Sequence, residues 1–266
     1  MKPINILTIA GTDPTGGAGI QADIKTISAL KAYSTSVITA IVAQNTYSVQ
    51  SIFSLDSKLV LSQLNSVLND VKINSCKIGM VGNSKIIKCI SNKLKEVDLP
   101  CIVLDTVMYT KNGFSLLSKN SIKTLIKYLF PISSIITPNL LEASILLNCK
   151  IAKSEEDMQF QGRELLKLGS KAVLLKGGHL NNTYSPDWLF TEKIEKRFSM
   201  KKINTLNTHG TGCCLSSALA TIKPNYKNWI DPIKKAKKWL QGAIINSNNL
   251  NVGTGRGPIN HFYKWW

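Results

Sequence analysis

The chain contains 266 residues, of which 44% are hydrophobic and 18% are charged. This length and composition are typical of one large folded α/β domain and exclude a disordered chain. The formal net charge is +17, a value also found in nucleic-acid-binding proteins. Because lysines are spread over nearly every segment, we interpret the charge as a composition bias that also attracts anionic substrates. We expect neither a nucleic acid nor a membrane as a partner.

The six cysteines indicate a reduced protein. They form no CxxC pair and no cluster with histidine at zinc-binding spacing. The first ten residues contain a short apolar run, but a glycine-rich loop follows it in place of a signal-peptide cleavage site. No stretch is long and apolar enough to span a bilayer. We therefore expect a cytoplasmic protein.

Short β-branched segments alternate with longer amphipathic segments along the chain. We predict strands at residues 4–9, 36–42, 76–78, 102–104, 134–136 and 172–175. We predict helices at residues 20–30, 59–71, 86–94, 122–129, 140–147, 159–168 and 228–245. A capping-box pattern from Ser154 to Asp157 precedes the sixth of these helices. A hairpin within residues 187–198 is expected to extend the sheet at one edge.

Repeated strand–helix units imply a mostly parallel sheet covered by helices on both faces. The sequence therefore predicts an α/β protein with a three-layer α/β/α arrangement. We find no internal repeat and no low-complexity linker, so we expect one domain over residues 1–266. Ligands of such sheets bind at the carboxyl ends of the strands, which is where polar residues gather in this sequence.

The first polar segment is a glycine-rich loop at residues 11–19. It matches neither a Walker A loop nor a dinucleotide-binding turn. A ligand loop and a plain strand-to-helix connection both remain compatible with it. Asp23, on the helix behind this loop, is either a solvated acid or a hydrogen-bond acceptor that faces a pocket.

Three further strand ends carry candidate functional residues. Asp105 ends an apolar strand, where a carboxylate needs a cation or water, so it indicates either a Mg²⁺ or phosphate site or a cap. Asn139 and Glu142 lie three residues apart at a predicted helix start, where they can hold hydrated Mg²⁺ or form an ordinary N-cap. Lys176 precedes two glycines and is interpreted as a phosphate contact.

The segment THGTGCCLS at residues 208–216 combines two glycines with a predicted helix start. Glycines let successive backbone N–H groups converge on an anion, and the helix dipole favours negative charge there. Cys213 lies at that positive end, where a thiol is expected to ionise more easily than a free cysteine. We interpret it as a base or nucleophile beside an anion, although a free cysteine is more often a small buried residue.

Three motifs together resemble a known enzyme family. They are AGTDPTGGAGIQAD at residues 10–23, KGGH at 176–179 and HGTGC at 209–213. These motifs are similar to those of the bacterial hydroxymethylpyrimidine/phosphomethylpyrimidine kinases of thiamine biosynthesis, and the resemblance covers essentially the whole chain. It implies a ribokinase-like fold, a homodimer, and two uses of MgATP. The first would phosphorylate the hydroxymethyl group of 4-amino-5-hydroxymethyl-2-methylpyrimidine, and the second would convert the monophosphate into the diphosphate.

The resemblance also implies roles for individual residues. The pyrimidine would lie between Gly11, Ala18, Asp23, Gln44, Met80, Val107 and Cys213. The nucleotide and the metal would lie beside Asp105, Asn139, Glu142, Lys176, Thr211 and Lys237. Two departures from the family pattern are Cys214, where the family more often has threonine, and Thr106, where it often has proline.

These residues suggest in-line phosphoryl transfer. Cys213 would accept or relay the proton of the substrate hydroxyl, while Lys176, Mg²⁺ and the N–H groups of residues 210–213, which include Gly210, Thr211 and Gly212, neutralise the γ-phosphate. The nearest alternative is a pyridoxal or pyridoxine kinase, since the implied fold and anion turn are shared. Related sugar and adenosine kinases usually have aspartate in place of Cys213. A basic nucleic-acid-binding protein is the alternative from another class.

Overall fold

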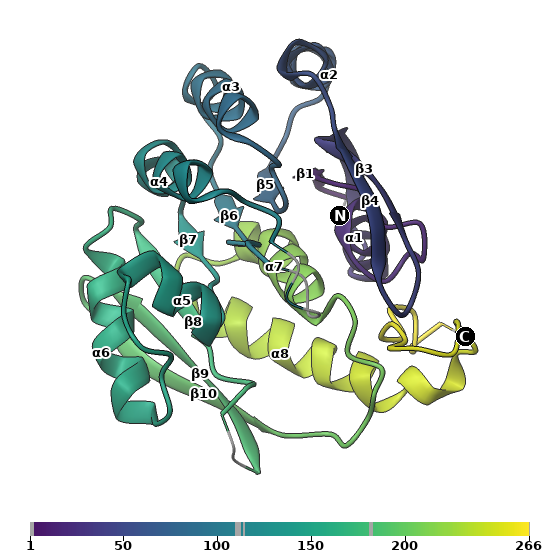
Figure 1. Ribbon diagram of the computed structural model, residues 1–266, viewed down its shortest axis with the longest axis vertical. Coiled ribbons are helices and arrows are strands. Elements are labelled where there is room, and N and C mark those ends of the chain that lie inside the picture. Colours follow the sequence, from purple (N-terminus) through teal and green to yellow (C-terminus); the bar gives the residue numbers. More distant parts are fainter. Residues whose placement is uncertain (1–2, 110–112, 114, 181–182, 266) are drawn as a thin grey trace.

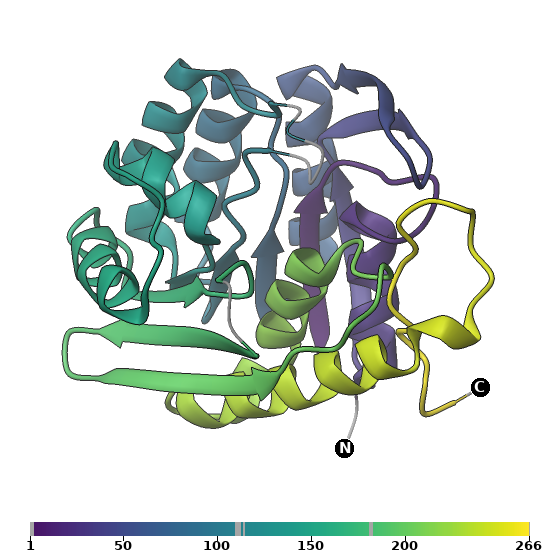
Figure 2. The ribbon, with the colours of Figure 1, turned by 60° about the horizontal axis from the view of Figure 1, so that its bottom comes forward.

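The computed structural model describes residues 3–109, 113, 115–180 and 183–265. The single-domain prediction covers residues 1–266, and its two ends lie outside the described residues. Figure 1 and Figure 2 show helices packed on both sides of one large sheet. The predicted three-layer α/β/α arrangement is therefore confirmed.

The central sheet is mostly parallel, as predicted. Its strands are β1 (Asn5–Ala10), β2 (Tyr33–Ile38), β5 (Ser75–Ile78), β6 (Ile102–Leu104), β7 (Ile135–Ile136), β8 (Ala172–Lys176), β9 (Tyr184–Thr191) and β10 (Glu195–Lys201). Within the described ranges the strand order is β10-β9-β8-β7-β6-β5-β1-β2. The strands from β2 to β8 in this order pair in parallel, whereas β9 pairs antiparallel with both β8 and β10. The predicted hairpin therefore extends one edge of the sheet.

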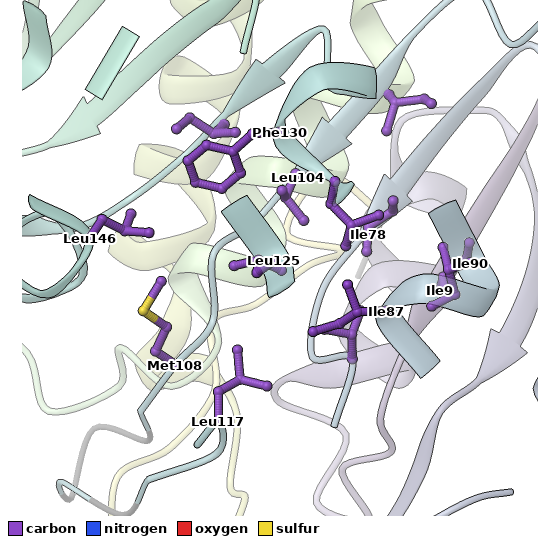
Figure 3. Close-up of a cluster of buried hydrophobic side chains, with 14 of the residues drawn as sticks. Ile9, Ile78, Ile87, Ile90, Leu104, Met108, Leu117, Leu125, Phe130 and Leu146 are labelled. Atoms are coloured by element: carbon purple, nitrogen blue, oxygen red, sulfur yellow. The ribbon is translucent and has the colours of Figure 1, made fainter. Parts of the chain in front are cut away.

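Two hydrophobic layers hold the helices against the sheet. One face carries α2 (Ser57–Asp70), α3 (Ser84–Lys95), α4 (Lys119–Tyr128), α5 (Leu140–Leu147) and α6 (Glu155–Leu166). The other face carries α1 (Gly19–Ala29), α7 (Thr211–Ile222) and α8 (Ile230–Ile245). Side chains alternate across a strand, so Leu7 and Ile9 of β1 join the first layer and Ile6 joins the second. Figure 3 shows part of the first layer, where Ile9 and Ile78 of the sheet lie near Ile87 and Ile90 of α3.

Local capping explains where several helices begin. Ser154 and Asp157 form the predicted capping box before α6, with each side chain accepting a hydrogen bond from the other residue's backbone N–H. Asn139 and Glu142 form a second capping box before α5. Short 3₁₀ helices, η1 (Phe130–Ile132), η2 (Lys223–Asn225) and η3 (Ser247–Asn249), complete the helical segments in the described part of the chain.

A small second sheet corrects one prediction. The segment 36–42, expected to be a single strand, is divided between β2 and β3 (Ala40–Gln44). Thr39 separates the two strands, since its backbone N–H donates to the oxygen of Ala10 and its hydroxyl donates to the oxygen of Met80. β3 then pairs antiparallel with β4 (Val49–Ser54), which the sequence did not predict. Figure 1 shows the two strands of this hairpin side by side, and the Thr12 N–H, just beyond the carboxyl end of β1, donates to the oxygen of Ala40.

Candidate active site

A cavity of about 300 Å³ lies at the carboxyl ends of the parallel strands. It brings together thirteen of the fifteen residues that the sequence singled out. These are Gly11, Ala18, Gln44, Met80, Asp105, Val107, Asn139, Glu142, Lys176, Gly210, Thr211, Gly212 and Cys213. They come from segments far apart in the sequence, so the sheet topology is what gathers them at one edge.

The turn before α7 requires glycine. Gly210 has a φ of +74°, in the left-handed region that favours glycine. A Cβ atom at this position would lie 1.7 Å from the backbone oxygen of Gly17 in the first glycine-rich loop. The two glycine-rich segments are therefore packed against each other. The helix that follows begins at Thr211, and its first turn lines the cavity, where the positive end of the helix dipole would favour an anion.

The Cys213 thiol is not the easily ionised group that its place at the helix start suggested. Burial raises the pKa of Cys213 to about 11, and this effect outweighs the attraction of the Lys77 ammonium. The carboxylates of Asp23 and Asp105 raise the pKa further. The expected easy ionisation is therefore wrong, because removal of the thiol from water outweighs the neighbouring positive charge, as the alternative interpretation of a small buried cysteine allows.

A charged cluster faces this turn from β6 and β8. The Nζ atom of Lys176 lies 3.0 Å from Oδ1 of Asp105, and the hydroxyl of Thr137 donates to the same oxygen at 2.9 Å. Burial raises the pKa of Asp105, but Lys176 and Lys77 more than reverse this and hold it below its ordinary value. A Cβ atom on Gly212 would lie 3.3 Å from Lys176 Nζ. The lysine, the carboxylate and the start of α7 therefore share one corner of the cavity.

Asn139 and Glu142 cap the start of α5, which is one of the two roles that the sequence left open for them. The Asn139 side chain accepts a hydrogen bond from the Glu142 N–H, and Glu142 Oε2 accepts one from the Asn139 N–H. The same oxygen also accepts a hydrogen bond from the hydroxyl of Thr106 at 3.0 Å. Burial raises the pKa of Glu142 above its ordinary value. Since both residues also line the cavity, the cap places a carboxyl group beside Lys176.

The donor set of this corner fits a hydrated Mg²⁺ bound together with phosphates. In the described ranges, no group of three or more His, Cys, Asp and Glu side chains is arranged to hold a metal by itself. Mg²⁺ typically keeps several waters and takes only one or two carboxylates in addition to substrate phosphates. Asp105 and Glu142 supply two such carboxyl groups at the cavity wall.

Two candidates lie outside the cavity lining. Asp23 is fully buried, and both of its carboxylate oxygens accept hydrogen bonds from Lys77 Nζ, at 2.8 and 2.7 Å. It therefore faces the lysine and not the space where a pyrimidine would lie. The ammonium of Lys237 on α8 is paired with Asp187 of β9. Asp187 lines the cavity, so Lys237 is one residue removed from it.

Several cavity residues were not predicted. Lys77 lines the cavity from the centre of β5, and a lysine within an apolar strand is a signal that could have indicated a buried carboxylate partner. Asp13 and His209 also line it and pair with each other. The apolar wall formed by β3 and β4, with Val42 and Ile52, carried no signal because that hairpin was not predicted.

Comparison with known proteins identifies the family. The model of the phosphomethylpyrimidine kinase family matches residues 13–260. The hydroxymethylpyrimidine/phosphomethylpyrimidine kinase of Escherichia coli K12 is 52% identical over 266 residues, which covers 100% of both chains. The crystal structure of phosphomethylpyrimidine kinase from Clostridium difficile 630 has a TM-score of 0.80 and 40% identity, covering 91% of this chain and 99% of that chain.

A pyridoxal kinase also has a similar structure. The enzyme of Staphylococcus aureus in complex with AMP-PCP has a TM-score of 0.90 but only 29% identity, covering 99% of this chain and 95% of that chain. The two kinds of kinase therefore share the ribokinase-like fold. This chain has the higher sequence identity to the phosphomethylpyrimidine kinase, 40% against 29%. On the match of the family model and the full-length identity of 52%, the chain belongs to the hydroxymethylpyrimidine/phosphomethylpyrimidine kinase family.

Proposed function

We propose that the chain is a MgATP-dependent kinase of 4-amino-5-hydroxymethyl-2-methylpyrimidine and of its monophosphate. The observation that carries this proposal is the meeting of the Gly210–Cys213 turn with the Lys176–Asp105 pair in one cavity. Backbone N–H groups and an ammonium that face the same space can stabilise the charge that develops on a transferring phosphoryl group. The full-length relatives support the pyrimidine as the acceptor.

The nucleotide side of the cavity would be formed by Asp105, Asn139, Lys176 and Thr211. Lys176 contacts the γ-phosphate in this proposal, because its ammonium lies beside the start of α7. Asp105 and Glu142 would hold Mg²⁺ through its waters. When bound, the metal neutralises phosphate charge and orients the phosphates.

The pyrimidine side would be formed by Gly11, Ala18, Gln44, Met80 and Val107. Gln44 is suited to the aminopyrimidine edge, because a side-chain amide both donates and accepts hydrogen bonds. Gly11 and Ala18, which have little or no side chain, leave room for a flat ring on this side of the cavity. Asp23 is removed from direct substrate contact because it is buried against Lys77.

Phosphoryl transfer would proceed in line. The substrate hydroxyl oxygen bonds to the γ-phosphorus, the bond between that phosphorus and the β–γ bridging oxygen breaks, and the hydroxyl proton passes to Cys213. In the second reaction the acceptor is a phosphate that is largely ionised near neutral pH, so it needs little help from a base. Cys213 is therefore proposed to matter more in the first reaction than in the second.

One assay distinguishes the proposed function from two alternative functions. The TM-score of 0.90 with a pyridoxal kinase favours pyridoxal as the alternative substrate. A nucleic-acid-binding protein with this fold would instead bind DNA in a steeply salt-dependent manner without ATP turnover. Measuring ATP consumption with hydroxymethylpyrimidine, its monophosphate and pyridoxal separates these cases. Turnover of both pyrimidines supports the proposal, and turnover of pyridoxal alone contradicts it.

We also propose that the chain forms a homodimer through the outer face of the β3–β4 hairpin. Ile41 and Phe53 are paired across these strands and are 48% and 70% exposed. In this proposal the pair forms the centre of an apolar contact face, since contiguous exposed apolar surface marks protein interfaces. We place the enzyme in the cytoplasm, since all six cysteines are free. Among the described residues, no helix has the length and apolar character needed to cross a membrane.

A further inference from the structure

A buried ion pair lies behind the wall of the cavity. Lys77, at the centre of β5, and Asp23, on α1, have no exposed surface. The ammonium contacts both carboxylate oxygens, and the carboxylate also accepts hydrogen bonds from the hydroxyls of Thr8 at 2.6 Å and Ser217 at 2.7 Å. These contacts fix the carboxylate from β1, β5 and α7 at once.

The pair is oriented with its cation towards the cavity. Lys77 lines the cavity, whereas Asp23 does not. Ser217 follows Cys213 by four residues on α7, so the two side chains lie on the same helix face. Gly79 leaves space for the ammonium, because a Cβ atom there would lie 2.6 Å from Lys77 Nζ. The pair is therefore fixed to α7 through its carboxylate, one helical turn from the thiol, and its ammonium borders the cavity that Cys213 also lines.

Charged groups reach Cys213 from four elements. Lys77 on β5 attracts a thiolate, and Asp23 on α1 and Asp105 at the end of β6 repel it. Lys176 at the end of β8 also attracts a thiolate. Of the two members of the pair, only Lys77 lines the cavity together with Cys213, so the cation is the member that shares this space with the thiol.

A contribution to the stability of the fold does not by itself explain why this ion pair is buried. Burying two charges costs a large desolvation free energy, and well-packed apolar residues often replace a buried ion pair with no loss of stability. The place of Lys77, which contacts Asp23 and lines the same cavity as Cys213, has a more specific consequence. A fixed ammonium acts strongly on a neighbouring thiolate where water does not screen the interaction.

We propose that Lys77, held in place by Asp23, is a positioning residue that stabilises the thiolate of Cys213 during the first phosphorylation. This inference rests on the proposed function, in which the hydroxyl proton moves to the sulfur as the oxygen bonds to the γ-phosphorus. Asp23 acts through Lys77, since it contacts the ammonium and does not line the cavity. The second phosphorylation, whose acceptor is already ionised, depends less on the pair.

Alkylation of Cys213 by iodoacetamide tests the charge coupling without any substrate. Well below the pKa of the thiol, the rate follows the thiolate fraction, and mass spectrometry of the peptide that contains Cys213 separates it from other thiols, with Cys213→Ser as the control for site assignment. In the charge-neutral double variant Lys77→Gln/Asp23→Asn, we expect alkylation at about pH 8.5 to slow by about threefold or more. The double variant Arg163→Gln/Glu195→Gln removes an exposed ion pair as a matched control and should leave the rate unchanged.

The single variant Asp23→Asn gives a result in the opposite direction. It keeps the ammonium and removes its counter-ion, so Cys213 alkylation should accelerate by about threefold or more. A merely structural pair would not shift the rate in opposite directions in two folded variants. Equal rates in wild type and either folded variant would overturn the proposal.

Kinetics then separate this inference from the proposed function. The neutral double variant should lower kcat/KM for hydroxymethylpyrimidine by about tenfold and for its monophosphate by less than about threefold. Equal losses for both acceptors overturn the role of Lys77 in the first phosphorylation. If neither pyrimidine is a substrate of the wild type but both alkylation shifts occur, the proposed function fails and the charge coupling is supported.

Discussion

The Nε2 atom of His209 lies 2.8 Å from Oδ2 of Asp13 and joins the first glycine-rich loop to the turn before α7. Asp13 also accepts hydrogen bonds from the N–H groups of Thr15 and Ala18. Burial raises the pKa of Asp13, but hydrogen bonds from His209, Gln44 and Thr15 reverse this and hold it far below its ordinary value. The carboxylate therefore connects the glycine-rich loop assigned to the pyrimidine side with the turn assigned to the phosphate side of the cavity.

Replacing Asp13 with asparagine should lower stability in a pH-dependent way. We expect the free energy of unfolding to fall by about 2 kcal/mol at neutral pH, because buried hydrogen bonds to a charged acceptor are lost. The folded state depresses the pKa of this carboxyl group, so its contribution is present above the unfolded value of 3.8 and is lost as the pH falls below it. Urea titrations of both proteins should show the difference shrinking from about pH 5 to about pH 3. A difference that stays constant over this range would contradict the assignment.

Gly210→Ala should disrupt the turn. Its Cβ atom would collide with the oxygen of Gly17, so we expect the free energy of unfolding to fall by about 3 kcal/mol or more, with loss of ATP turnover. Gly169 is a matched control, because it also has a positive φ, +110°, but its Cβ atom would meet nothing closer than 3.9 Å. Gly169→Ala should cost only about 1 kcal/mol and leave turnover intact. Similar effects of both substitutions would argue against the close packing of the two loops.

Cys213→Ala should separate the two phosphorylations. We expect kcat/KM to fall by about 100-fold for hydroxymethylpyrimidine and by less than about fivefold for its monophosphate. Because burial raises the pKa of Cys213 to about 11, the thiolate fraction grows throughout the neutral range. The wild-type rate of the first step should therefore rise from about pH 7 to about pH 9, and this rise should be absent in the variant. Equal losses in both steps would exclude the thiol as the group that takes the proton.

Lys176→Met should slow both phosphorylations alike. Its ammonium is assigned to the γ-phosphate, which is common to both reactions, so we expect kcat/KM to fall by about 100-fold for each acceptor. Lys171→Met changes an exposed lysine just before the same strand and should leave both values near those of wild type. A loss confined to one acceptor would place Lys176 on the acceptor side of the cavity.

Phe53→Asp should convert the proposed dimer into a monomer. The substitution places a carboxylate in an apolar face, where burial against a second copy would be costly. Phe160 on α6 is 61% exposed and provides a control substitution, Phe160→Asp, away from the hairpin. Sedimentation velocity should show the mass halved for the first variant only. A wild-type protein that sediments as a monomer would exclude the dimer.

The sequence predicted the fold well where its signals were local. The alternation of apolar strands and amphipathic helices is visible along the chain, and the capping box at Ser154 indicated the start of α6. The division of segment 36–42 was not visible, because it depends on hydrogen bonds from Thr39 to Ala10 and Met80, which come from distant segments. A continuous β-branched run gives no sign of such a break.

The site was predictable as a set of residues but not in its electrostatics. Glycines and polar residues after strands indicated part of the cavity lining, and the family resemblance supplied Gly11, Ala18, Gln44, Met80 and Val107. The environment of Cys213 was not predictable, because its burial and its neighbours Lys77 and Asp23 arise from the packing of α1, β5 and α7. The family resemblance placed Asp23 beside the pyrimidine. The sequence did not show that a buried lysine, Lys77, would pair with this carboxylate.

The acceptor specificity of the purified protein decides whether it is a pyrimidine kinase. Purified protein, MgATP and a single acceptor are combined, and ADP release is followed together with the mass of the product. We predict that hydroxymethylpyrimidine is converted first into its monophosphate and then into its diphosphate, with much slower turnover of pyridoxal. Phosphorylation of pyridoxal with no reaction of either pyrimidine would contradict it.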